Sequence, residues 1–428
     1  MGRTVLPSQG PHSGLENGYG PTAAKDRIES LDNLRGLALL MILIANMPGF
    51  NSPIYYLGEA GQQWWSSRAD HVVQVLVFTF VQGESVSLFS FLFGLGFAMQ
   101  LLRAQSHSVY FMFVYVRRLL ALVVLGLIHA YLIWTGDILA LYGVLGFFLL
   151  FFRNLKPKVI LLLALALYLI PPARWELSLV QHCGGSEPGK ITAPSKASAT
   201  PAQVEARRQV ESSVHAYAHG TWREITAQRT KDYSFYLAHN QALTVFPVFL
   251  FGLYCGRRGF FGDLPVYGES FSRACRWSFG AALVGTILIR ALYLQGIPAW
   301  ITLLRPLVYV VEHAALVIFY ISAVVLLSEN ERIKRYMAPL AAAGRLALSN
   351  YIFQSVVCTL IFYSYGLGYY GKVSPVQGMV LVLLVFVLQV FLSVLWLRRY
   401  RLGPVEWVLR SITYGRLQAI RSEHGESS

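Results

Sequence analysis

The chain has 428 residues, of which 55% are hydrophobic and only 14% charged, and its formal net charge is +14. Several apolar runs are long enough to cross the roughly 30 Å hydrocarbon core of a bilayer. This composition excludes an ordinary soluble globular protein and predicts an all-α, polytopic integral membrane protein. The basic residues are spread along the chain, so they do not indicate a nucleic-acid partner, which would need them gathered on a soluble domain.

Hydropathy predicts about ten membrane spans. The second apolar run is too long for one straight helix, since at ~1.5 Å per residue it would extend roughly 45 Å. We therefore expect a break near Gly83. The predicted spans fall at 33–50, 72–101, 119–136, 138–152, 158–172, 241–256, 274–296, 303–327, 346–366 and 377–397.

The spans predict five regions. A tail at 1–26, rich in Gly, Ser and Pro, is typical of disorder, and the first apolar run has no obvious cleavage site that would make it a signal peptide. Two five-span bundles, at 27–172 and 241–410, flank an external segment at 173–240, and a second tail occupies 411–428. The second half of the external segment has helical composition and spaced aromatics, so we expect an amphipathic helix that anchors at the interface or caps a cavity.

Lysines and arginines determine the predicted orientation. With a cytoplasmic N-terminus, every short basic segment falls on the inner side, as the positive-inside rule requires, and the C-terminus is then cytoplasmic too. These segments contain Lys25, Arg27 and Arg35; Arg103, Arg117 and Arg118; Arg153, Lys156 and Lys158; Arg257 and Arg258; Arg332, Lys334 and Arg335; and Arg398, Arg399 and Arg401.

Cysteine usage predicts neither a disulfide nor a metal site. Cys183 is expected outside, Cys255 and Cys275 near the inner face and Cys358 within a span, so an intrachain structural disulfide is not expected. The sequence has no CxxC pair and no HExxH helix.

His129 is the leading functional candidate because an ionisable side chain inside a span is costly without a partner or a role. Asp137 follows eight residues later, directly after Gly136. In one interpretation His129 is a general base, and a kink or neighbouring helix brings Asp137 close enough to orient it. In the other, a neutral His129 bonds a neighbouring helix while Asp137 caps the next helix.

Arginines near the inner ends of spans have two interpretations. Asp32 and Arg35 are three residues apart and can pair on one helical face. Arg35, Arg117 and Arg118 either reflect only the positive-inside rule or also bind a phosphate.

Further polar residues lie within the spans. Asn350 and Gln354, with Ser349 and Ser355 beside them, either join helices or grip a substrate. In the outer half, Glu312 is a candidate partner for Arg290 or Arg305. Alternatively, these groups line an acceptor site together with His313 and Glu84.

Six motifs follow one another along most of the chain. They are RIESLDNLRGLALLMILIAN at 27–46, LFSFLFGLGF at 88–97, RRLLALVVLGLIHAYLIWTGDILALYG at 117–143, FPVFLFG at 246–252, GRLALSNYIFQS at 344–355 and RLGPVEWVLR at 401–410. Together these motifs resemble the YeiB family of bacterial inner-membrane proteins. That family is similar to a wider group of membrane acyltransferases, which includes the acyltransferase-3 proteins and the lysosomal heparan glucosaminide acetyltransferase.

The resemblance implies a multi-pass protein of the bacterial inner membrane that moves an acyl group across it. The donor is expected to be acyl-CoA, bound from the cytoplasm with no resident cofactor, and the acceptor a hydroxyl or amine of an envelope, lipid-linked or secreted molecule. Asn46 stands where acyltransferase-3 proteins carry a histidine, and an asparagine cannot act as a base. Glu84 stands where many YeiB-like proteins carry a basic residue. Membrane lipids are expected partners, and a homo-oligomer is compatible with this class.

A transporter or permease for a small molecule or lipid is the alternative. Glu84, His129, Arg290 and Glu312 would then form a proton or substrate path, and Gly83 and Pro306 would break helices to build a binding site. No internal repeat is evident, which disfavours the inverted-repeat transporters. A non-catalytic role in membrane organisation is a third option.

Overall fold

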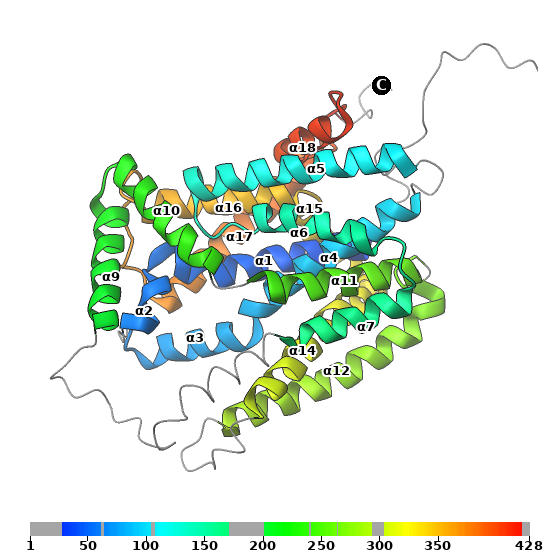
Figure 1. The fold of residues 1–428 in the computed structure, drawn as a ribbon, viewed down its shortest axis with the longest axis horizontal. Coiled ribbons are helices and arrows are strands. Elements are labelled where there is room, and N and C mark those ends of the chain that lie inside the picture. Colours follow the sequence, from blue (N-terminus) through cyan, green and yellow to red (C-terminus); the bar gives the residue numbers. More distant parts are fainter. Residues whose placement is uncertain are drawn as a thin grey trace, which may run out of the picture.

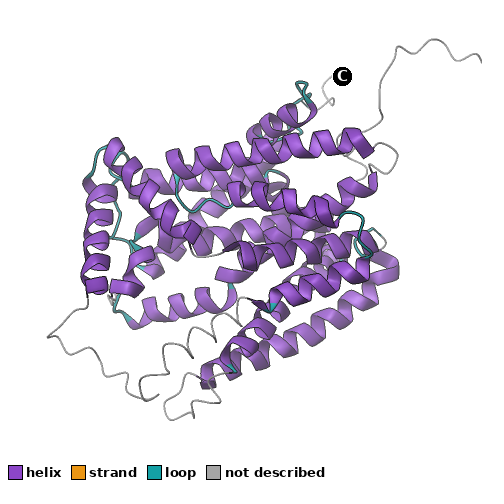
Figure 2. Cartoon of the chain, viewed as in Figure 1, coloured by secondary structure: helices purple, strands orange, loops and turns teal. Residues whose placement is uncertain are grey.

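The computed structural model describes residues 28–60, 64–103, 108–170, 201–238, 241–262, 264–292 and 304–421. Within these ranges the named elements are all helices, with no β-strand (Figure 2). The helices form one bundle whose members run roughly side by side, and two shorter helices cover one end of it (Figure 1). The predicted tail at 1–26, the linker-like start of the external segment and Cys183 lie outside the described residues.

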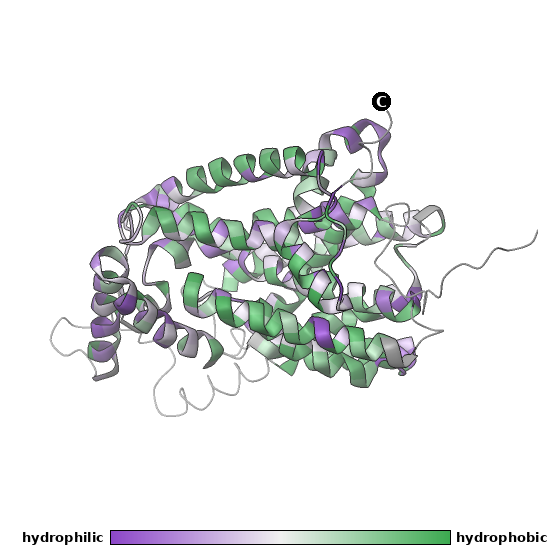
Figure 3. Cartoon of the chain, turned by 90° about the horizontal axis from the view of Figure 1, so that it is seen from above, coloured by the Kyte–Doolittle hydropathy of each residue, from purple (hydrophilic) through white to green (hydrophobic). Residues whose placement is uncertain are grey.

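Six helices among the described residues are long and apolar enough to cross a membrane. A seventh candidate is the pair α15 (Glu331–Arg345) and α16 (Ala347–Phe362), which is bent by 77°. In Figure 3 hydrophobic residues dominate these long helices. The all-helical membrane class is therefore confirmed. The six are α1 (Glu29–Asn51), α3 with α4 (Arg68–Phe80 and Gln82–Arg103), α5 (Ser108–Ile128) with the turn after it, α12 (Leu264–Leu292), α14 (Arg305–Glu329) and α17 (Pro375–Leu397).

Three further predicted spans fold as shorter helices. The runs at 138–152 and 158–172 become α6 (Leu139–Phe152) and α7 (Pro157–Tyr168), of 14 and 12 residues. At 1.5 Å per residue these are about 21 Å and 18 Å long, less than the bilayer core. The run at 241–256 becomes α11 (Gln241–Arg258), which is also not among the six.

The second apolar run is interrupted close to the expected position. α3 ends at Phe80, Val81 leaves helical geometry, and α4 begins at Gln82, just before Gly83. The Tyr320 hydroxyl of α14 donates to the Phe80 carbonyl at 2.9 Å. A break at membrane depth needs such partners for the backbone groups that the helix no longer satisfies.

The second half of the external segment is helical, as predicted, but forms two helices instead of one. These are α9 (Pro201–His219) and α10 (Trp222–Ala238), which cover one end of the bundle (Figure 1). At the start of α10, Thr221 N donates to Glu224 at 2.7 Å, and the Glu224 N–H points back to the Thr221 hydroxyl at 3.4 Å. This reciprocal cap turns the chain between the two helices. The remaining short helices are α2 (Ile54–Ala60) and α18 (Pro404–Tyr414).

Two glycines allow α4 and α11 to pack with their backbones in contact. A Cβ at Gly94 would lie 1.9 Å from the Phe249 carbonyl oxygen, and one at Gly252 would lie 2.2 Å from that of Phe91. Neither carbonyl can retreat without moving its helix, so only glycine fits at both positions. Small residues at such crossings are the usual means of close helix packing in membranes.

We expect Gly94→Ala to lower the free energy of unfolding by about 1–3 kcal/mol, because the new methyl group overlaps a backbone carbonyl. Gly96→Ala, two residues later on the same helix, is the matched control, since its Cβ would meet nothing within 4 Å. Thermal unfolding of both variants in one detergent measures the difference. Equal melting temperatures for the two would show that the α4–α11 crossing is not this tight.

Candidate active site

A π-helical turn places His129. The turn, His129–Ile133, continues α5, and the Trp134 N–H closes it by donating to the His129 carbonyl at 2.8 Å. The chain then reverses over residues 134–138, and α6 runs back beside α5. This reversal brings Asp137 to His129, with 2.9 Å between Nδ1 and Oδ2. The sequence required a kink for Asp137 to reach His129, and this kink is a π-turn. Such turns often occur at functional sites.

Asp137 makes both of the contacts that the two interpretations assigned to it, one to the imidazole and one to the start of the next helix. Its Oδ2 contacts the imidazole, while its Oδ1 accepts the Ala140 N–H at 2.8 Å and so caps α6. The two bonds hold the carboxyl group between a helix terminus and the ring. The hydrogen bond that caps α6 therefore also orients the Asp137 carboxyl group, which in turn orients His129.

Ser355 of α16 completes a chain of three side chains. Its Oγ lies 2.9 Å from Nε2 of His129. His129 is 0% exposed, and Asp137 and Ser355 are each 1% exposed. Ser355 was only weakly indicated by the sequence, as one of two serines beside Asn350 and Gln354, because its partner lies 226 residues away.

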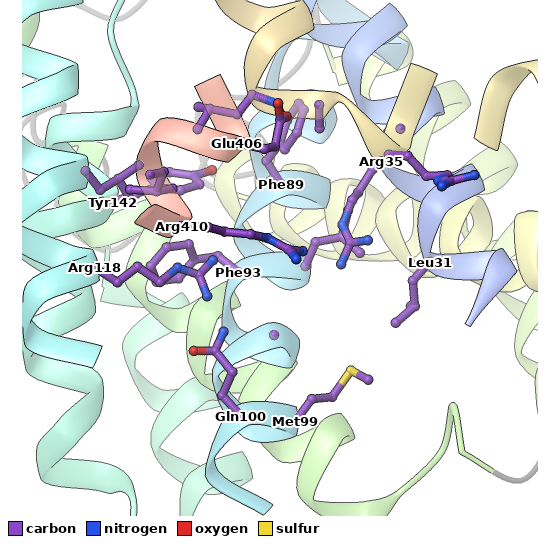
Figure 4. A pocket seen from close by; sticks show the side chains of 18 of the residues that line it. Leu31, Arg35, Phe89, Phe93, Met99, Gln100, Arg118, Tyr142, Glu406 and Arg410 are labelled. Atoms are coloured by element: carbon purple, nitrogen blue, oxygen red, sulfur yellow. The ribbon is translucent and has the colours of Figure 1, made fainter. Parts of the chain in front are cut away.

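A cavity of about 390 Å³ lies among the first two turns of α1, the part of α4 from Phe89 to Arg103, the starts of α6 and α16, and α18. In Figure 4 the guanidinium groups of Arg118 and Arg410 point into it. Its lining contains five arginines and two carboxylates, an excess of three positive charges. The charged lining residues are Arg35, Arg103, Arg118, Arg345, Arg410, Asp32 and Glu406.

Both carboxylates in the cavity wall are already engaged. Asp32 pairs with Arg35 at 2.5 Å, as the three-residue spacing predicted. Glu406 accepts the backbone N–H groups of Leu348 and Ser349, at 2.7 and 3.1 Å, and also the Ser349 hydroxyl. Glu406 therefore caps the N–H groups in the first turn of α16, a position where a carboxylate is favoured.

The other arginines leave the cavity electropositive. Among the described residues, neither Arg118 nor Arg410 forms an ion pair with a carboxylate. Burial, together with the guanidinium groups of Arg118 and Arg35, lowers the pKa of Arg410, although Tyr414 and Glu406 oppose this. A bound anion would relieve the repulsion. The lining of the cavity is therefore electropositive.

Tyr351 lies between the cavity and the buried histidine. It lines the cavity, its ring centroid is 5.0 Å from that of His129, and its hydroxyl donates to the Gly136 carbonyl at 2.9 Å. His129, Asp137 and Ser355 themselves do not line the cavity. One aromatic side chain thus separates a basic cavity from a buried Asp–His–Ser chain.

The arginines predicted to act together are separated. Arg35 and Arg118 line the cavity, but Arg117 does not, and its guanidinium lies over the Phe113 ring at 5.4 Å. Successive helical residues point about 100° apart, and here the packing of α5 turns Arg118 rather than Arg117 towards the cavity. Asn46 is half-buried and also outside the cavity lining.

Asn350 and Gln354 join helices. The Asn350 amide donates to the Ala343 carbonyl and to Ser393 Oγ, at 2.9 and 3.0 Å. The Gln354 amide donates to the Leu39 carbonyl at 3.2 Å and to Gln389 at 2.9 Å. These bonds connect α16 with α1, α15 and α17, which matches the interhelical interpretation.

Glu84 and His313 form a second buried pair. His313 Nδ1 lies 2.8 Å from Glu84 Oε1, and its Nε2 lies 2.9 Å from Ser87 Oγ. The rings of Tyr168 and Tyr309 stack beside the imidazole, with centroids 6.4 and 6.0 Å away. Glu84 Oε2 is buried and has no hydrogen-bond partner among the described residues.

Glu312, the candidate partner of Arg290 or Arg305, accepts a hydrogen bond from Thr286 at 3.0 Å. Arg290 donates to Thr79, and Arg305 donates to the Leu292 carbonyl. Each of these contacts crosses between helices or helix ends.

Arg229 of α10 joins the α9–α10 pair, which forms a cap over one end of the bundle, to the π-turn. Its side chain is fully buried and donates to the Leu132 carbonyl at 2.8 Å and to Tyr365 at 3.2 Å. The rings of Trp222 and Tyr363 lie 5.0 and 5.5 Å from its guanidinium carbon. The sequence did not mark this arginine, because its aromatic surroundings come from segments more than 130 residues apart.

Asp232, one turn further along α10, is the acceptor at the centre of the cap. It receives hydrogen bonds from Tyr56, Tyr217 and Gln228, at 2.6, 2.6 and 2.8 Å. Burial raises its pKa, although these three hydrogen bonds act in the opposite direction. The cap is therefore a packed polar structure rather than a surface anchor alone.

Among the described residues, no three His, Cys, Asp or Glu side chains gather into a group that could hold a metal ion. Cys255, Cys275 and Cys358 are free thiols.

The fold and site define a multi-helix membrane protein with a buried acid–histidine–serine chain beside a basic cavity. Residues 255–416 match the family model described as a protein of unknown function (DUF418). The chain is 35% identical over 413 residues to the uncharacterized protein YxaH of Bacillus subtilis (strain 168), covering 92% of this chain and 96% of YxaH. It is 28% identical over 403 residues to the uncharacterized protein YeiB of Escherichia coli (strain K12), covering 91% and 96%. The chain belongs to the family of YxaH and YeiB, and the resemblance to YeiB is confirmed.

We expect Arg229→Lys to loosen the cap, because an ammonium cannot reproduce the planar fork that bonds Leu132 and Tyr365. The loss should be roughly 1.5–3 kcal/mol, the usual contribution of a hydrogen bond to a charged group. Arg223→Lys, exposed on the same helix, is the control. Thermal unfolding and limited proteolysis of α9–α10 read out both variants, and equal stability of the two would contradict the role given to Arg229.

Proposed function

We propose that this protein is an integral-membrane acyltransferase that moves an acyl group from a cytoplasmic acyl-CoA to a hydroxyl or amine on the far side. The observation that carries the proposal is the position of Tyr351, between an arginine-lined cavity and a buried histidine held by an aspartate. An anion site and a general base are the two elements that acyl transfer from a phosphate-bearing donor requires.

The cavity suits the CoA portion of the donor. Coenzyme A carries several phosphates, and arginine forks bind phosphate oxygens in pairs. Apolar side chains such as Leu92, Phe93, Leu122 and Leu139 line the same cavity and offer surface for the pantetheine and acyl parts. Arg118 and Arg410 carry the phosphate contacts in this proposal, with Arg35 beside them.

His129 supplies the base. Near pH 7 an imidazole can take the proton of an attacking hydroxyl or amine, which typically contributes about 10²–10⁴-fold to a rate. Asp137 holds the ring through Nδ1, and Nε2, which faces Ser355 Oγ at 2.9 Å, is the nitrogen that would take the proton. The same chemistry is the one expected from the sequence motifs, through their resemblance to acyltransferase-3 proteins and the heparan enzyme.

The topology that fits this proposal has ten spans and cytoplasmic termini in a bacterial inner membrane. α6, α7 and α11 would lie at membrane depth beside the longer helices, and the bent pair would count once. The arginine cavity then opens to the cytoplasm, as the positive-inside rule favours. The α9–α10 cap would face the other side, where a lipid-linked, envelope or secreted acceptor arrives.

The first test is acyl-CoA binding to the purified protein in nanodiscs, with acetyl-, butyryl-, octanoyl- and palmitoyl-CoA. We expect saturable binding that Arg118→Gln weakens about tenfold or more, because it removes a charge-assisted contact. Arg117→Gln, at the neighbouring position, is the matched control and should bind normally. Equal weakening by both variants would mean that general surface charge, rather than this cavity, attracts the ligand.

The second test concerns His129. We expect His129→Gln to retain donor binding while the release of free CoA, followed with a thiol reagent, falls at least about a hundredfold. Normal CoA release by a well-folded, donor-binding variant would remove His129 from the chemistry.

Transport is the second candidate function, and the buried Glu84–His313 pair favours it. Glu84 Oε2 has no partner among the described residues, and α4 begins beside it at a helix break. Intramembrane carboxylates at broken helices occur in proton and substrate paths. The acyl-CoA binding test separates the two functions, because the absence of binding by every acyl-CoA in the series would favour a transporter.

A further inference from the structure

The acid–histidine–serine chain has the connectivity of a nucleophilic triad. Asp137 contacts the Nδ1 side of the imidazole at 2.9 Å, and Ser355 contacts the Nε2 side, also at 2.9 Å. This order is the one in which a histidine activates a serine hydroxyl, and it is recognised by geometry rather than by sequence position. We infer that Ser355 is the nucleophile and carries the acyl group as a covalent ester between donor and acceptor. The inference rests on the proposed acyl transfer.

The aspartate contact sets the required tautomer. A carboxylate can only accept, so with Asp137 in this form the ring hydrogen lies on Nδ1. Nε2 then presents a lone pair to the Ser355 hydroxyl. A second bond, from Ala140 N to Oδ1, keeps the carboxylate in place. The Ser355 hydroxyl also lies 3.4 Å from the Tyr351 carbonyl, a longer contact than the one to His129.

Trp134 supplies a candidate donor for the oxyanion. Its ring lies edge-on to His129, with centroids 6.5 Å apart, and it is 2% exposed. Its indole N–H is buried and has no hydrogen-bond partner among the described residues. A buried donor without a partner is costly, and a tetrahedral intermediate beside His129 would provide the acceptor.

The surroundings explain why a covalent carrier is useful here. The basic cavity ends at Tyr351 on one side of the triad, and the α9–α10 cap meets the π-turn through Arg229 and Leu132. Direct transfer would need donor and acceptor to meet at one buried point. An ester on Ser355 lets each substrate react in turn from its own side.

The two half-reactions balance. Ser355 Oγ attacks the thioester carbonyl as its proton passes to His129 Nε2. The C–S bond then breaks, and the CoA sulfur receives that proton. In the second half, the acceptor hydroxyl or amine attacks the ester carbonyl while His129 takes its proton. The C–O bond to Ser355 breaks, and the serine oxygen is reprotonated.

The test needs no acceptor, because a double displacement exchanges CoA with acyl-CoA. The full chain in nanodiscs is mixed with unlabelled acetyl-CoA and tritiated CoA, and in parallel with the longer acyl-CoAs. We expect labelled acyl-CoA to form, and Ser355→Ala to lower that rate at least about a thousandfold while donor binding persists. Thr359→Val, one turn along the same buried face, removes a different hydroxyl and should exchange normally.

Carbon-14 acyl-CoA identifies the bond itself. After denaturation, the label should map to Ser355 and resist neutral hydroxylamine, as an oxygen ester does. Ser355→Cys should retain a label that hydroxylamine now removes, because the adduct is a thioester. This change in chemistry is one that a merely structural serine would not produce.

Two results would overturn the inference and leave the proposed function standing. In the first, the wild-type protein transfers acyl groups or releases CoA, but neither exchanges CoA with acyl-CoA nor becomes labelled with carbon-14. In the second, the carbon-14 label persists in Ser355→Ala or maps to Ser87, His129 or Cys358. A wild-type protein that neither binds nor cleaves any acyl-CoA would instead overturn the proposed function, and the inference with it.

Discussion

Every polar group at membrane depth must find its partner within the protein, and this constraint organises the molecule. Lipid offers no hydrogen bonds, so an unpartnered amide or imidazole there is expensive. Asn350, Gln354 and Gln389 find such partners in one another and in the backbone of neighbouring helices. His129 has a hydrogen-bond partner on each of its ring nitrogens. Among the described residues, seven buried side-chain atoms have no hydrogen-bond partner. Two of them, Trp134 Nε1 and Glu84 Oε2, belong to residues that lie beside the buried histidines.

The basic cavity arises from the way helix ends meet. The 77° bend between α15 and α16 exposes the first turn of α16, and Glu406 of α18 caps its N–H groups. That cap holds α18 against the bundle and brings Arg410 opposite Arg118 (Figure 4). The Glu406 carboxylate is thus committed to a helix terminus. The positive charge of the cavity remains available for a ligand as a consequence of the fold.

The π-turn after α5 links the two ends of the molecule. Its first residue is His129, and its Leu132 carbonyl receives Arg229 from the cap. Asp137, in the loop that follows, caps α6, whose next residues line the cavity wall. Movement of the cap would therefore act on the histidine through a few directly bonded residues.

The sequence by itself determined the all-helical membrane class, most of the helices, the break near Gly83 and the Asp32–Arg35 pair. These features depend on hydropathy, helix period or a three-residue spacing, all of which are local. It also marked His129 and Asp137, because ionisable residues are rare in apolar runs. Tertiary structure alone decided that Ser355, Arg410 and Arg229 are functional candidates, since their partners are far away in the chain. It also separated Arg118 from Arg117, because neighbouring helical residues point about 100° apart and only packing selects the one that faces the cavity.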